Sequence, residues 1–198
     1  MKEENSFEKR KLMKISTDKV VCNVYMDRFM DRKVRIQVAE YGGEKRSISA
    51  NLDFDEMALF AADCLTGTMI KKIEKAAAEG KQYSLGYKGS PSSSNYGGKP
   101  ESREITIGRM EKNGVATYFF NIIRREGLTT STGAIIPNKQ RDTSKDVKLS
   151  VPMSQDDLRT LFIYSYDCAK AFMVPYFTSL VKQVALEDKK FKENKQQE

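Results

Sequence analysis

The sequence predicts an α+β fold made of two tandem ββββα units, each with an antiparallel sheet and a helix packed on one face. Three observations predict it. A strand followed by a helix cap occurs twice with an offset of 101 residues, alternating apolar and polar segments lie upstream of each copy, and an Asn-Gly pair marks a hairpin. At 198 residues the chain is long enough for a well-buried body without disulfide or metal staples.

The repeat pairs residues 46–57, RSISANLDFDEM, with residues 147–158, VKLSVPMSQDDL. In both copies a short alternating strand leads into a helix start, where a capping residue and an acidic residue stand three apart: Asp53 with Glu56, and Ser154 with Asp157. The first pair resembles a capping box, and both pairs place acidic charge at the positive end of the helix. The two helices are therefore expected to begin in the same way.

The first unit is expected to contain four strands and one helix. Its elements are a weaker strand over 9–16, alternating strands over 22–26 and 34–38 joined by a hairpin at 27–32, the strand of the repeat, and a helix over 54–79. In the helix, Met57, Ala61 and Cys64 belong to one apolar stripe that should lie on a sheet. Gly67 weakens this helix at midlength, and Gly80 is placed to end it.

The second unit repeats this order with longer loops. Its elements are a strand over 82–87, a mobile Ser, Gly and Pro-rich loop over 89–102, a long hairpin, a basic loop over 126–146, the strand of the repeat, and a helix over 155–186. Pro175 is expected to kink or interrupt that helix. The whole chain thus divides into a flexible amino terminus at 1–8, a first repeat at 9–80, a second repeat at 81–186 and a charged tail at 187–198.

Asn113-Gly114 is the strongest local signal, because this pair favours a two-residue type I′ turn that fixes the strand register. The register places Gly108 opposite Phe119 and Thr106 opposite Asn121. One face of the hairpin is then apolar and is expected to be core: Ile105, Ile107, Tyr118, Phe120 and Ile122. On the other face Phe119 stands over a glycine, which leaves an aromatic ring available on a surface.

The positive charge is concentrated in the second half of the chain. The net charge is +7, and residues 81–148 contain 12 Lys and Arg against 6 Asp and Glu, whereas residues 15–80 contain 10 against 11. A basic segment rich in strand formers indicates a polyanionic partner, bound through phosphate neutralisation and counterion release. The alternative is a basic surface kept for solubility.

Two tandem units of four strands and one helix resemble the Pur-alpha repeat and, more broadly, the superfamily that holds the Whirly proteins and the PC4-type transcriptional coactivators, several of which occur in phages. The resemblance spans residues 9–186 and concerns the order of elements. It implies curved sheets that bind single-stranded DNA or RNA through exposed aromatic and basic residues, and a homodimer or higher homo-oligomer formed through the helices. The long loops at 89–102 and 126–146 depart from the Pur pattern.

Carried onto this chain, the resemblance implies outward-facing polar, aromatic and basic residues on both sheets. Together with the basic residues of the second long loop, the nucleic-acid-binding candidates are Asn23, Tyr25, Arg35, Gln37, Phe119, Asn121, Arg125, Lys139, Arg141 and Lys148. Unstacked bases would stack on the rings for about 1–3 kcal/mol each, and the cations would meet phosphates. Such binding tolerates many sequences and weakens with salt.

Composition argues against an enzyme. The chain has no histidine, so the usual general base and metal ligand are missing, and it has no phosphate-binding glycine loop and no Cys-x-x-Cys motif. No catalytic residue, metal or cofactor is expected. The three cysteines, the absence of an amino-terminal secretion signal and the absence of a long apolar run predict an intracellular, cytoplasmic protein with free thiols and no membrane contact.

Two alternatives are kept beside nucleic-acid binding. The apolar second half of the last helix, residues 172–184, is typical of a non-enzymatic interaction or inhibitory module that assembles through this helix.

The second alternative is a nuclease that holds Mg²⁺ with the acidic pairs Asp55/Glu56 and Asp156/Asp157. However, adjacent residues on a helix point apart, and acidic residues are favoured in the first turn of a helix for capping. The capping interpretation is preferred.

Overall fold

A computed structural model describes residues 10–42 and 46–195 of the chain, with side chains described up to residue 187. The predicted flexible segment 1–8 and the last residues of the predicted tail, 196–198, lie outside the described residues.

Within the described residues the chain forms two antiparallel sheets and three α-helices. The first sheet has the order β1-β2-β3-β4, with β1 (Lys11–Ser16), β2 (Val20–Tyr25), β3 (Lys33–Glu40) and β4 (Ser47–Asp53). The second sheet has the order β5-β6-β7, with β9 and β8 both paired to β7; its strands are β5 (Tyr83–Ser90), β6 (Glu101–Lys112), β7 (Val115–Thr129), β8 (Ile135–Pro137) and β9 (Val147–Met153). The helices are α1 (Phe54–Leu65), α2 (Thr68–Ala78) and α3 (Gln155–Lys195).

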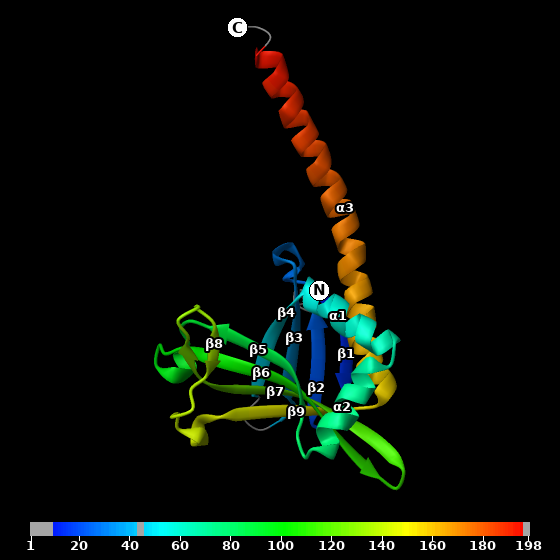
Figure 1. Cartoon of the computed structure of the whole chain (residues 1–198), viewed down its shortest axis with the longest axis vertical. Helices are drawn as coiled ribbons and strands as arrows, with labels where there is room; N and C mark the ends of the chain where they lie inside the picture. Colours follow the sequence, from blue (N-terminus) through cyan, green and yellow to red (C-terminus); the bar gives the residue numbers. More distant parts are fainter. Residues whose placement is uncertain (1–9, 43–45, 196–198) are drawn as a thin grey trace, which may run out of the picture.

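The two sheets cross each other steeply, and one face of each contributes to a shared core (Figure 1). Alternation along the strands explains this, since successive side chains of a strand point to opposite faces and one set is apolar throughout. The core residues include Val24, Ile36, Ala50, Leu52, Ile107, Tyr118, Phe120, Ile122, Leu149 and Val151. Both halves of the chain therefore fold around one core, as expected of two units that cannot each bury enough apolar surface alone.

The long hairpin confirms the predicted register. Gly108 pairs with Phe119, Thr106 with Asn121, and the turn residues Asn113 and Gly114 have φ of 53° and 75°. These positive values are those of a type I′ turn, which matches the right-handed twist of the flanking strands. The face predicted to be core is buried throughout.

The helices begin as the repeat predicts. At α3 the Ser154 hydroxyl accepts a hydrogen bond from the Asp157 backbone N–H (3.0 Å), and the Ser154 N–H donates to the Asp157 carboxylate (3.0 Å). At α1 the Asp53 N–H donates to Glu56 (2.9 Å), and Lys88 of β5 forms an ion pair with the same carboxylate. The start of α1 is therefore tied to the second sheet.

Two helix predictions are corrected. The helix predicted over 54–79 is divided at Gly67, whose φ of 74° separates α1 from α2. The predicted interruption at Pro175 does not occur: α3 continues through it to Lys195, and the carbonyl on Ala171 that loses its helical donor belongs to an exposed residue that water can reach. Beyond the core, α3 extends alone away from the sheets (Figure 1).

The two predicted loops are shorter than the sequence suggested. β5 extends to Ser90 and β6 begins at Glu101, so residues 91–100 connect them. β7 extends to Thr129 and pairs with the unpredicted strand β8. Close packing explains the lack of a side chain at Gly127 and Gly89, because an added Cβ would lie 2.8 Å and 2.3 Å from Ile135 of β8.

Candidate nucleic-acid interface

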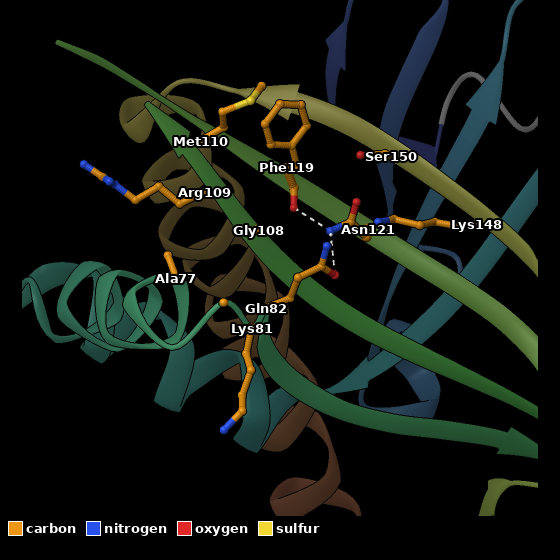
Figure 2. A pocket seen from close by; sticks show the side chains of 11 residues that line it. Ala77, Lys81, Gln82, Gly108, Arg109, Met110, Phe119, Asn121, Lys148 and Ser150 are labelled. Carbon is orange, nitrogen blue, oxygen red and sulfur yellow. Dashed lines mark hydrogen bonds between the residues drawn. The ribbon is translucent and has the colours of Figure 1, made fainter. Parts of the chain in front are cut away.

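The outer face of the second sheet carries an open pocket of about 420 Å³. Its floor comes from β6, β7 and β9, and its wall from the end of α2 and the turn into β5 (Figure 2). Its volume lies within the range of about 300–1,000 Å³ that is usual for ligand sites. It is lined by Lys81, Gln82, Gly108, Phe119, Asn121 and Lys148, among others.

Phe119 gives the pocket an aromatic side. Its cross-strand neighbour is Gly108, which has no side chain to cover the ring, and the Gln82 amide lies above that glycine, 3.5 Å from where a Cβ would stand. The ring is half-buried and does not belong to the core cluster. It is therefore free to stack on a flat ligand.

The floor beside the ring is a chain of hydrogen bonds. The Asn121 side-chain amide donates to the Phe119 carbonyl (2.9 Å) and to the Thr106 hydroxyl (3.2 Å), and that hydroxyl donates to Gln82 Oε1 (2.7 Å). Figure 2 shows the Asn121 and Gln82 amides turned toward each other below Phe119. Asn121, predicted to face outward, does lie on this face but has no exposed surface, and so positions its neighbours from below.

Three cations surround the pocket. Lys148 is exposed, and no ion pair to it within 4 Å is found among residues 10–42 and 46–187. Lys81 is paired with Glu79 (3.0 Å) and Arg109 with Glu111 (2.6 Å), and the hydrogen bond to Glu111 raises the pKa of Arg109. Two of the three cations are thus paired with exposed carboxylates, and the charge of Lys148 remains as an excess of positive charge at the pocket.

On the outer face of the first sheet the four predicted residues lie together, but they contact one another and leave little of the Tyr25 ring exposed. The Arg35 guanidinium lies over the Tyr25 ring, 4.4 Å from the centroid, and is paired with Asp27 (3.1 Å). The Tyr25 hydroxyl donates to Gln37 (3.2 Å), and Tyr25 is 8% exposed. Asn23 is buried beside them. A base could reach the Tyr25 ring only if Arg35 moved.

The basic residues of the second long loop divide into two kinds. Arg141 is paired with Asp146 (2.6 Å), which raises the pKa of Arg141, and Arg125 is paired with Glu104 and with Asp146 (3.4 Å). These two arginines hold the loop against the sheet. Lys139 is exposed, and within the described part of the chain no ion pair involves it.

Sequence reasoning missed Lys81, Gln82 and Arg109 as pocket residues. Lys81 and Gln82 follow the predicted helix end at Gly80, but their place at the pocket, with the Gln82 amide over Gly108, depends on how α2 lies against β6. The bare glycine opposite Phe119 was the available signal, since it predicts that something other than a cross-strand side chain approaches there.

Of the acidic pairs considered for metal binding, Asp55, Glu56 and Asp157 have other partners, and Asp156 is exposed. Glu56 accepts from the Asp53 N–H and from Lys88, and Asp157 accepts from Ser154. Asp55 is exposed and paired with Arg32 (3.5 Å). In the described residues no cluster of three or more Cys, Asp or Glu side chains has the geometry to hold a metal ion.

Comparison with known proteins gives a likeness of structure but none of sequence. No protein-family model matches the chain, and no curated protein matches its sequence. Among solved structures, the crystal structure of WHY1 from Arabidopsis thaliana is similar to this chain, with a TM-score of 0.46 and 12% sequence identity. The similarity covers 89% of this chain and 94% of that chain.

No helix in the described ranges is long and apolar enough to cross a membrane.

Proposed function

We propose that this protein binds single-stranded DNA or RNA, without catalysing a reaction, on the outer face of the second sheet. The observation that carries the proposal is Phe119, a partly exposed ring over a bare glycine, at a basic pocket whose floor contains hydrogen bonds from the Asn121 amide.

The pocket favours single strands over duplexes for a geometric reason. An aromatic ring stacks on the face of a base, and in a duplex that face is covered by the neighbouring base pairs, so Phe119 can reach it only in an unpaired strand. Stacking contributes about 1–3 kcal/mol per base and accepts any base, while lysines meet the phosphates. We expect binding that tolerates many sequences and weakens as salt rises.

The predicted residues have different parts in this proposal. Phe119 stacks, and Lys148 and Lys139, both exposed, contact the backbone. Asn121 holds the floor, while Arg125 and Arg141 hold the loop through Asp146.

On the first sheet, Arg35 and Gln37 with Asn23 and Tyr25 form a second, weaker contact surface in this proposal. The cation there is already stacked on its own tyrosine and paired with Asp27, so the surface offers less to a nucleic acid than the pocket does. The two faces correspond to the two repeats, with the boundary at residues 80 and 81.

A second candidate function follows from α3. Where it leaves the body, this helix exposes apolar side chains at alternating spacings of three and four, including Phe177, Leu180 and Val184. That spacing suits a helix of the same kind, because a and d positions interlock with like positions on a partner. We propose that a second copy of the chain packs there, giving a homodimer or higher homo-oligomer. An interaction module assembling through α3 is the alternative to nucleic-acid binding.

The location proposed is intracellular. Cys22 and Cys64 are buried free thiols, and burial raises their pKa to about 12 and about 11 respectively. Such thiols are unreactive and suit a reducing compartment such as the cytoplasm.

Fluorescence anisotropy with a labelled oligonucleotide at low and moderate salt tests the proposed function. We expect saturable binding at micromolar protein or below, weaker with salt, and much weaker binding to a duplex of equal length. Light scattering of the same samples reports the oligomer, and replacing Leu180 with glutamate should dissociate it. If an oligomer forms but no oligonucleotide binds, the interaction module replaces the proposed function.

A further inference from the structure

We propose that the ring of Tyr87 is a second base-stacking site, so that one single strand lies along a diagonal of the second sheet from Phe119 to Tyr87. This inference rests on the proposed function. It extends the contact surface from the pocket to β5, the strand at the edge of the sheet.

The strand register places Tyr87 on the same face of the sheet as Phe119. Tyr87 pairs with Glu104 of β6, and Glu104 pairs with Ile123 of β7. Ile123 lies four residues after Phe119 in the same strand, and side chains an even number of residues apart point to one face. Both rings therefore lie on the outer face, opposite the side chains that form the core.

Tyr87 keeps part of its ring open to solvent. The residue is 46% exposed, whereas Tyr25 on the first sheet is covered by Arg35. Burial and the Glu104 carboxylate, to which the Tyr87 hydroxyl is hydrogen-bonded, raise the pKa of Tyr87. A hydroxyl held by the adjacent strand makes the ring lean across the sheet. Among residues 10–42 and 46–187 neither another ring nor a cation is stacked on it, so a base can be.

The surface between the two rings suits a nucleic-acid strand. The carboxylate that lies there, Glu104, is paired with Arg125, which offsets its repulsion of phosphates. Asn121 and Ile123, the next outward-facing residues of β7, are buried, so neither side chain obstructs the path. Lys148 of β9 pairs with Ile123 and adds an exposed cation on the same face.

The separation of the two rings determines which bases they contact. Tyr87 lies two strands and four residues from Phe119, which at about 4.8 Å per strand and about 3.4 Å per residue gives a diagonal of roughly 17 Å. A stacked nucleic-acid strand advances about 3.4 Å per nucleotide. A fully extended one advances about 7 Å, because a nucleotide has six backbone bonds and an amino-acid residue has three. The rings should therefore stack on bases about three to five nucleotides apart rather than on neighbours.

Anisotropy titrations of the full chain test this spacing. The oligonucleotides have one length and carry two thymines in an otherwise abasic strand, so the charge is constant and only the separation of the bases varies. Wild type should bind about fivefold more tightly, or more, when the thymines are about three to five nucleotides apart than when they are adjacent, because a second stack forms.

Variants assign this dependence to the ring. Tyr87→Ala should remove the effect of thymine separation, whereas Tyr87→Phe keeps the ring without its hydroxyl and should retain the effect. Tyr164→Ala removes an equally exposed tyrosine from α3 and should leave the effect unchanged. Thermal melts verify folding, which Tyr87→Ala should affect little because Tyr87 is exposed and outside the core cluster.

The possible failures are distinguishable. If wild type does not bind oligo(dT) of the same length, the proposed function and the second stacking site fall together. If it binds oligo(dT) but thymine separation has no effect on affinity, the second site alone is refuted, and this result needs no variant. A dependence on separation that persists in folded Tyr87→Ala would equally refute the role of this ring.

Discussion

Replacing Phe119 with alanine should weaken binding of a single-stranded oligonucleotide by about 5- to 150-fold. The estimate takes one lost stacking interaction of about 1–3 kcal/mol, at about 1.4 kcal/mol for each tenfold change in affinity. A single stack is assumed because, on the outer face of the second sheet, Phe119 is the aromatic ring that lines the pocket.

The fold should survive this change. The backbone of Phe119 is paired on both sides, with Gly108 of β6 and Pro152 of β9, and alanine keeps the carbonyl that accepts from Asn121. The ring is only partly buried and lies outside the core cluster, so the free energy of unfolding should fall by about 1 kcal/mol, well below the roughly 3–5 kcal/mol for a buried phenylalanine.

Anisotropy titrations at one fixed low salt concentration measure the affinity, and thermal melts by circular dichroism check folding. Phe119→Trp keeps a stacking ring and should therefore bind the oligonucleotide with at least the affinity of the wild type. Tyr164→Ala removes an exposed ring from α3 and should leave affinity unchanged. A folded Phe119→Ala protein with wild-type affinity would refute the role assigned to this ring.

Three further predictions concern charge. Lys148→Ala should weaken binding on every sequence alike and reduce the slope of log K against log salt by about 0.7, the value for one phosphate contact in a single strand, measured by anisotropy across a salt series; an unchanged slope would contradict a contact there. Asp146→Ala leaves Arg141 and Arg125 without a shared carboxylate and should lower the free energy of unfolding by about 1.5–3 kcal/mol in urea titrations; an unchanged midpoint would show that the pairs contribute nothing. For Glu101, burial acts to raise the pKa, but hydrogen bonds from Ser93 and Asn95 and the Arg103 guanidinium outweigh it and hold the pKa below its usual 4.5. A carboxyl with a lowered folded pKa stabilises the fold above its unfolded pKa, and this contribution is lost as pH falls through the folded pKa. Melts from neutral pH to below 4 should therefore show a steeper loss of stability in wild type than in Glu101→Gln, and equal slopes would contradict the assignment.

Local features of the fold were predictable from the sequence. Asn113-Gly114 fixes its own register because two positive φ values admit few turns, and from that register the buried and outer faces follow by alternation. The reciprocal cap at Ser154 and Asp157 follows equally from residue types three apart. Both signals are local, so no knowledge of tertiary packing was needed.

What the sequence did not reveal depends on contacts between distant segments. Alternation places Tyr25 on an outer face, but it does not say that the side chain of Arg35 lies across the ring. Likewise Asn121 faces outward in the hairpin and is buried because Gln82, 39 residues earlier, comes to lie over it. The continuation of α3 through Pro175 depends on solvent reaching the freed carbonyl.

The outer face of the second sheet can be tested directly by photocrosslinking. The full chain would be irradiated with a single-stranded oligonucleotide containing a photoreactive thymidine analogue, digested, and mapped by mass spectrometry. We expect the main crosslinks in residues 101–129, with Phe119 the principal site, and their loss when unlabelled single strand but not duplex is added. Crosslinks confined to α3 or to the first sheet, or none above those of an unrelated basic protein, would contradict the proposed interface.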